Sequence, residues 1–100
     1  MPVTTNVSPD SKRVEISVSG RFDFSMHKEF RDAYRNYPGL VEYRVNLNAA
    51  SYMDSSALGM LLLLRERAGG DRASIAITHC SPGIRKIFAV SNFDRLFRID

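Results

Sequence analysis

The chain has 100 residues, 44% of them hydrophobic, and its 14 basic and 11 acidic residues give a net charge of +3. This length suits one small core, so we predict a single domain over residues 1–100. The basic residues are scattered among acidic neighbours, which argues against direct binding to nucleic acid.

No apolar run approaches the ~20 residues that a membrane span needs. The N-terminus lacks the basic and apolar regions of a signal peptide. The single cysteine, Cys80, cannot form an internal disulfide, which suits a reducing compartment. We therefore expect a cytoplasmic protein.

The first part of the chain predicts a β-hairpin followed by a helix. Val3–Val7 is β-prone, residues 8–12 are typical of a turn, and residues 14–18 alternate between apolar and polar. Residues 20–24 are expected to form a loop. A helix is expected to start at Ser25 and to end at Pro38-Gly39. The apolar positions that recur at helical spacing are Met26, Phe30, Ala33, Tyr34 and Tyr37.

The remaining elements alternate between strands and helices. Strands are predicted over residues 41–47 and 73–77, and a last extended piece over 96–99. One helix follows Asp54 and ends at Gly69-Gly70; another has Ser81 as N-cap and ends at Asn92. The order β-β-α-β-α-β-α-β predicts an α/β fold: a mixed sheet of about four to five strands with helices packed on it.

The helix after Asp54 is apolar around much of its circumference. Either it is buried on more than one side, or part of it faces a partner. The predicted core stripe is Leu58, Leu61, Leu62 and Ala68, flanked by Met60, Leu63 and Leu64.

The start of this helix carries Asp54, Ser55 and Ser56. A helix N-terminus has unsatisfied N–H groups and a partial positive charge, so it favours acidic or hydroxyl caps. Simple capping by Asp54 or Ser55 is one interpretation. The same features can hold a phosphate group, which is the other interpretation.

The run Asp-Ser-Ser-Ala-Leu-Gly at residues 54–59, with the aliphatic run and the residues 65–70 after it, closely resembles the signature of STAS domains. That family includes the bacterial anti-sigma factor antagonists. The resemblance covers nearly the whole chain, and residues 20–23 match a Gly-x-x-Asp motif of the family. It implies that a partner kinase phosphorylates Ser55 (Ser56 fits less well), with Asp23 beside it. Ala57 departs from the glycine frequent there, and the further C-terminal helix of many STAS domains is missing.

The resemblance also implies the partners. The unphosphorylated form would sequester an anti-sigma factor with a GHKL-type serine kinase fold and so free a sigma factor. A PP2C-like serine phosphatase would restore that form. The residues predicted to form the docking patch are Asp23, Asp54, Ser55, Ser56, Ala57 and Met60.

Two other functions stay open at this point. One is a STAS scaffold or regulatory subunit of a stress-signalling or lipid-transport ATPase complex. The other is a nucleotide- or lipid-binding module, which would need a pocket, whereas the sequence has no phosphate-binding loop.

The sequence does not predict an enzyme. His27 and His79 lie on separate elements without metal-ligand spacing, and Cys80 should point away from its neighbour His79. Ser55 lacks the flanking glycines of a nucleophile elbow. We therefore expect no catalytic residue, no metal site and no cofactor.

Overall fold

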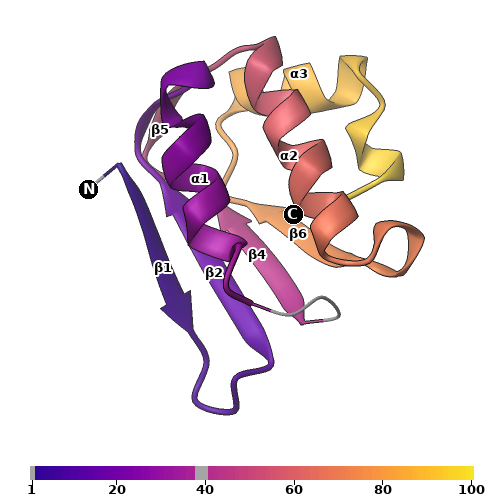
Figure 1. Cartoon of the computed structure of the whole chain (residues 1–100). Helices are drawn as coiled ribbons and strands as arrows, with labels where there is room; N and C mark the ends of the chain where they lie inside the picture. Colours follow the sequence, from indigo (N-terminus) through magenta and orange to yellow (C-terminus); the bar gives the residue numbers. More distant parts are fainter. Residues whose placement is uncertain (1, 38–40) are drawn as a thin grey trace.

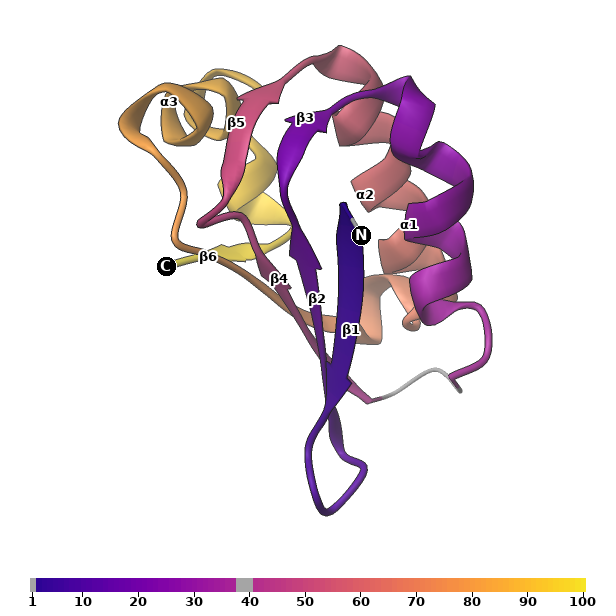
Figure 2. The same cartoon turned by 90° about the vertical axis from the view of Figure 1, so that its left-hand side faces the viewer.

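The computed structural model describes residues 2–37 and 41–100, and it places a five-stranded sheet at the centre of this part of the chain (Figures 1 and 2). The strand order is β1-β2-β4-β6-β7. β1 and β2 form the predicted antiparallel hairpin, and the other neighbours pair in parallel. The predicted mixed α/β sheet is therefore confirmed. The strand bounds are Val3–Val7 (β1), Arg13–Val18 (β2), Glu42–Asn46 (β4), Ser74–Thr78 (β6) and Arg98–Ile99 (β7).

A second, two-stranded parallel sheet was not predicted from the sequence. It pairs β3 (Gly20–Phe22) with β5 (Ala50–Met53), so the expectation of a loop over residues 20–24 is wrong. Gly20 has a φ of +80°, which lets the chain turn from β2 into β3. The Gly20 N–H donates to the Ala49 carbonyl at 2.9 Å. Strands this short show no alternation of apolar and polar residues in the sequence. Each of them is a strand because it pairs with the other.

Three α-helices lie between the strands, and one of their predicted ends is corrected. α1 (His27–Tyr34) begins after a 3₁₀ turn, η1 (Phe24–Met26), and not at Ser25. Its predicted end at Pro38-Gly39 lies outside the described residues. α2 spans Ser55–Arg67. α3 (Pro82–Val90) ends with Asn92 two residues on, whose left-handed φ of 60° cannot continue a helix, so the predicted end at Asn92 is confirmed.

The predicted signals at the other helix ends are confirmed. The Ser81 side chain accepts a hydrogen bond from the Ile84 N–H at 3.3 Å, with Pro82 in the first turn. Gly69 and Gly70 have φ values of 121° and 61°. They lead from α2 into the short 3₁₀ turn η2 (Gly70–Arg72), and a second such turn, η3 (Phe93–Arg95), precedes β7.

The core lies between the sheet and the helices α1 and α2, which run side by side over one face (Figures 1 and 2). Alternate residues of β2, β4 and β6 point into it. The opposite side of β2 and β4 carries polar residues, for example Ser17 and Asn46, which are register partners, whereas Ala76 and Thr78 on that side of β6 are buried as well. The buried residues on the core side of these strands are Val14, Ile16, Val18, Tyr43, Val45, Ile75 and Ile77.

The buried stripe of α2 differs from the predicted one. Leu62 is 39% exposed and Leu63 is 58% exposed, whereas Met60 and Leu64 are buried. Leu61 and Ala68 belong to both stripes, and Leu58 is partly buried, so the prediction is wrong only for Leu62, which lies ~100° around the helix from Leu61 on the exposed side. The residues of α2 and its C-cap that face the core are Ala57, Met60, Leu61, Leu64 and Ala68.

Tyr43 provides a first test of this packing. Its side chain is fully buried, and its hydroxyl has no hydrogen-bond partner among the described residues. Burial also raises the pKa of the Tyr43 phenol. Because a buried unsatisfied hydroxyl is destabilising, Tyr43→Phe should raise the free energy of unfolding by about 1 kcal/mol in urea melts. Tyr52→Phe, at an exposed tyrosine, should change it by less than about 0.5 kcal/mol; a destabilised Tyr43→Phe would contradict this packing.

Candidate functional site

The short β3–β5 sheet brings two aspartates to one edge. Phe22 and Met53 are register partners at the ends of these parallel strands. Asp23 follows the first and Asp54 follows the second, and each residue opens a helical turn. The carboxylates therefore lie at the same end of the two strands, beside the N-termini of η1 and α2.

Asp54 is the N-cap of α2, so the first of the two interpretations of this helix start, simple capping, describes what Asp54 does. Its Oδ1 accepts hydrogen bonds from the Ser56 N–H at 3.0 Å and from the Ser56 hydroxyl at 2.5 Å. Ser56 is only partly exposed. Its hydroxyl is thus held against the helix start.

Asp23 repeats the same arrangement on the neighbouring strand. It accepts hydrogen bonds from the Ser25 N–H at 3.0 Å and from the Ser25 hydroxyl, and its Oδ2 lies 3.4 Å from Arg21 Nε. These contacts, with the Ser25 hydroxyl first, lower the pKa of the Asp23 carboxyl. A lowered carboxyl pKa stabilises the fold above about pH 4, and this contribution disappears as the pH falls through the lowered value.

Ser55 differs from both of these serines. It is the first residue of α2 and is exposed. No side-chain hydrogen bond joins its hydroxyl to the described residues, because Ser56 takes the bonds to Asp54. Of the two candidate hydroxyls, that of Ser55 is the one open to another molecule.

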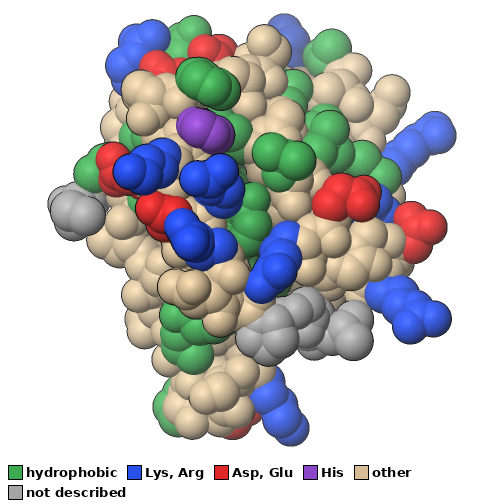
Figure 3. Space-filling model, viewed as in Figure 1, with side chains coloured by type: hydrophobic (Ala, Val, Ile, Leu, Met, Phe, Trp, Pro, Cys, Tyr) green, Lys and Arg blue, Asp and Glu red, His purple; other side chains and the backbone are tan. Residues whose placement is uncertain are grey.

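Ser55 also stands at the head of an exposed stripe along α2. Residues four, seven and eight positions further on share its side of the helix. A Cβ placed on Gly59 would meet nothing within 4 Å. Figure 3 shows hydrophobic side chains over α2 at this surface. We call this the α2 stripe; its residues are Ser55, Gly59, Leu62, Leu63 and Glu66.

The predicted docking residues divide into two groups. Asp23, Asp54, Ser55 and Ser56 lie together at the ends of β3 and β5. Ala57 is fully buried and Met60 is 6% exposed, so their side chains face the core and not a partner. The exposed apolar surface of α2 is carried by Leu62 and Leu63 instead.

Four residues near this edge, in two contacting pairs, were not predicted as site residues. Phe24 is 66% exposed, and its ring stacks on that of His27 with centroids 4.7 Å apart. Tyr52 is 40% exposed, and Arg21 Cζ lies 4.0 Å from the centre of its ring. One feature of the sequence could have indicated this surface. Phe24 is an apolar residue in a predicted loop, and it does not belong to the helically spaced apolar positions that begin at Met26.

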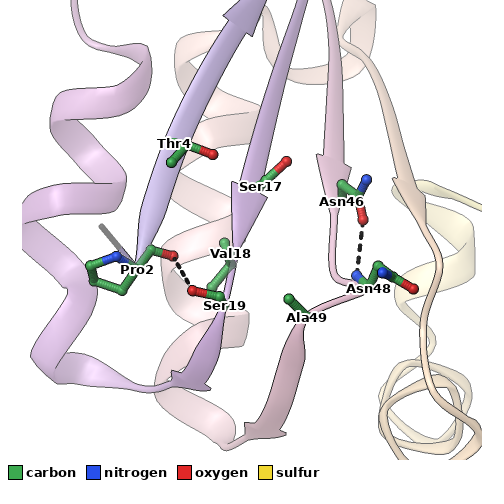
Figure 4. A pocket seen from close by; sticks show the side chains of 8 residues that line it. All are labelled: Pro2, Thr4, Ser17, Val18, Ser19, Asn46, Asn48 and Ala49. Carbon is green, nitrogen blue, oxygen red and sulfur yellow. Dashed lines mark hydrogen bonds between the residues drawn. The ribbon is translucent and has the colours of Figure 1, made fainter.

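A surface pocket and the Cys80 thiol lie away from this edge. A pocket of about 270 Å³ on the polar side of the sheet is lined by hydroxyl and amide side chains such as those of Ser17 and Asn46, and it includes no predicted site residue (Figure 4). The Cys80 thiol packs against the core, and burial raises its pKa.

Residues 2–37 and 41–100 contain no group of three or more His, Cys, Asp or Glu that could hold a metal ion. Within the same residues, no helix has the length and apolar character to cross a membrane.

Comparison with known proteins decides the family. Residues 5–98 match the family model described as "Mlab, STAS domain". A STAS-domain containing protein of Pseudomonas aeruginosa (strain UCBPP-PA14) is 51% identical over 100 residues, which are 99% of each chain. The chain belongs to the STAS domain family.

Solved structures share this STAS fold at low sequence identity. A putative anti-sigma factor antagonist from Thermotoga maritima has a TM-score of 0.81 at 14% identity, covering 97% of this chain and 84% of that one. The anti-sigma factor antagonist SpoIIAA in its unphosphorylated form has a TM-score of 0.76 at 19% identity, covering 98% and 87%. The Bacillus SpoIIAA in its phosphorylated form has a TM-score of 0.67 at 18% identity, covering 98% and 90%.

Proposed function

We propose that this STAS domain is a cytoplasmic anti-sigma factor antagonist whose binding is switched off by phosphorylation of Ser55. The unphosphorylated form binds an anti-sigma factor with a serine kinase fold of the GHKL type, and a PP2C-like phosphatase regenerates it. One observation carries the proposal. Ser55 is exposed at the head of the α2 stripe, and its hydroxyl makes no side-chain hydrogen bond to the described residues.

The electrostatics of the site support a switch. A phosphate on Ser55 adds about −1.5 to −2 charge at neutral pH. It stands beside the N-terminus of α2, whose dipole favours an anion, so the fold accommodates it. Asp54 and Asp23 then make the edge strongly anionic. An acidic or apolar surface docked on the α2 stripe is repelled.

A second candidate is a STAS scaffold or regulatory subunit of a stress-signalling or lipid-transport ATPase complex. The matching family description names Mlab and no sigma factor pathway, which favours this candidate. In that role the α2 stripe binds its partner without a phosphate on Ser55. The two candidates share a docking surface and differ in how the surface is controlled.

The deciding experiment captures partners from a lysate of the source cell with the wild type, Ser55→Ala and Ser55→Asp. Intact-mass analysis follows the recovered wild type. We expect the wild type and Ser55→Ala to capture a kinase-like anti-sigma factor and Ser55→Asp to lose it. A species about 80 Da heavier, one phosphate, should appear in the wild type and be absent from Ser55→Ala.

Ser11→Asp is the matched control, because Ser11 is exposed in the turn between β1 and β2, far from the start of α2 (Figure 1). It should capture the partner as the wild type does. Equal capture by all variants, with no phosphate on the wild type, would replace the switch by the scaffold or ATPase-subunit function.

Gly59 tests the α2 stripe separately from the switch. Gly59→Ala should raise the free energy of unfolding by about 0.5–1 kcal/mol, because alanine favours a helix interior and its methyl group meets open space. It should weaken capture of the partner at least about fivefold, since overfilling a close contact costs about 1 kcal/mol or more. Urea melts and a binding titration measure the two effects. A more stable variant that binds as well as the wild type would show that no partner lies close to Gly59.

A further inference from the structure

We propose that Phe24 is the aromatic anchor of this docking surface and inserts into an apolar pocket of the partner that is rimmed by acidic side chains. The inference rests on the proposed function, because it concerns the same edge of the domain. It adds a residue outside α2 and specifies the chemistry of the partner's surface.

Phe24 and Ser55 occupy equivalent positions after neighbouring strands. In each case an aspartate follows the strand and caps the next helical turn, and Phe24 or Ser55 is the first residue of that turn. The register between Phe22 and Met53 therefore brings Phe24 to the same edge as Ser55. A surface that covers Ser55 closely enough to sense a phosphate extends over the neighbouring strand end.

The exposure of Phe24 has no explanation within the domain. At 66% it is the most exposed aromatic side chain of the described residues, while Phe22 and Phe30 on either side are buried. Its ring already lies flat against the His27 imidazole, with 3° between the planes. A side chain held in this way loses little conformational freedom on binding, and exposed aromatic anchors of this kind dominate many interfaces.

The charges around Phe24 determine the partner's chemistry. Arg21 is 65% exposed, and Lys28 and Arg31 of α1 are exposed, whereas the Asp23 side chain is 19% exposed and tied to Ser25 and Arg21. Over α1, Lys and Arg side chains lie among acidic and hydrophobic ones (Figure 3), and the exposed Asp32 is paired with Arg35 at 3.1 Å. Acidic groups around an apolar pocket complement this surface. A phosphate on Ser55 would place negative charge against the same acidic rim.

The test uses the partner recovered with Ser55→Ala, purified and titrated by calorimetry against variants made in the Ser55→Ala background. Phe24→Ala should weaken binding at least about 30-fold, as loss of an aromatic hot spot does. Val90→Ala is the control: Val90 is 76% exposed and lies on α3. It should bind within about twofold of its parent. Circular dichroism should show the same fold for both.

A second readout uses the absence of tryptophan from the chain. Phe24→Trp introduces a single indole, whose emission should shift to the blue and become protected from iodide on adding the partner. Val90→Trp should show neither effect. A blue shift when the concentration of the variant alone is raised would assign Phe24 to contact with a second copy of this chain and overturn the proposal.

The outcomes separate this inference from the proposed function. If Ser55→Asp abolishes binding but Phe24→Ala binds within twofold of its parent, the anchor is wrong and the switch stands. If Phe24→Ala weakens binding but Ser55→Asp does not, the anchor stands and the switch is wrong. If Ser55→Ala recovers no partner, both fail.

Discussion

Leu63→Asp is expected to abolish partner binding while leaving the domain folded. Leu63 is 58% exposed in the middle of the α2 stripe, so a carboxylate there stays in water in the free protein. Burying that carboxylate unpaired in the complex costs several kcal/mol, which corresponds to a loss of at least about 100-fold in affinity. Calorimetry with the purified partner measures the loss, and urea melts should show a change below about 0.5 kcal/mol in the free energy of unfolding.

Glu66→Ala is a suitable control for Leu63→Asp. It changes the charge of the same helix by one unit at the far end of the α2 stripe. Its effect on affinity should be small and should shrink further with added salt, as for charges at the rim of an interface. Unchanged binding by Leu63→Asp would place the partner elsewhere, whatever the result for Ser55.

Leu61→Ala should have the largest effect on stability. Leu61 is fully buried between α2 and the sheet, and truncation of such a leucine costs about 2–5 kcal/mol through lost burial and the cavity left behind. For a chain of this size that is a drop of at least about 8 °C in the melting temperature, measurable by calorimetry.

The neighbouring Leu62 is the matched control for Leu61. It is the same residue type one position along the same helix, but it is 39% exposed. Leu62→Ala should cost less than about 1 kcal/mol. Equal losses for the two variants would mean that the buried stripe of α2 is the one expected from the sequence, and not the one in the structure.

The sequence predicted the features that depend on local chemistry. The alternation in β2 and β4, the Ser81-Pro82 helix start and the helix end at Gly69-Gly70 are each set by a few consecutive residues, and each is confirmed. The same kind of signal predicted an N-cap at Asp54 or Ser55, and the structure has Asp54.

The failures have two physical causes. β3 and β5 are too short to show a pattern, and they exist because Arg21 and Phe22 pair with Tyr52 and Met53 from a distant part of the chain. The buried side of α2 could not be read because five apolar residues in succession, 60–64, fit more than one stripe. Both errors fall at the site, so Ala57 and Met60 were assigned to the docking surface and Phe24 was overlooked.

The sheet topology has a consequence for how the domain opens. β1 and β2 are the one strand pair of the described sheets joined by a short turn; each of the others closes across a helix or a longer crossover. β7 is the last strand in the sequence and is held through two register pairs to β6, at the edge opposite β1. Local unfolding should therefore begin at β7. The Asp100 amide, which bonds to the Ile77 carbonyl at 2.9 Å, should exchange its hydrogen faster than the amides of β4, which lie between two strands. Protection of Asp100 equal to that of β4 would show instead that the domain opens as one unit.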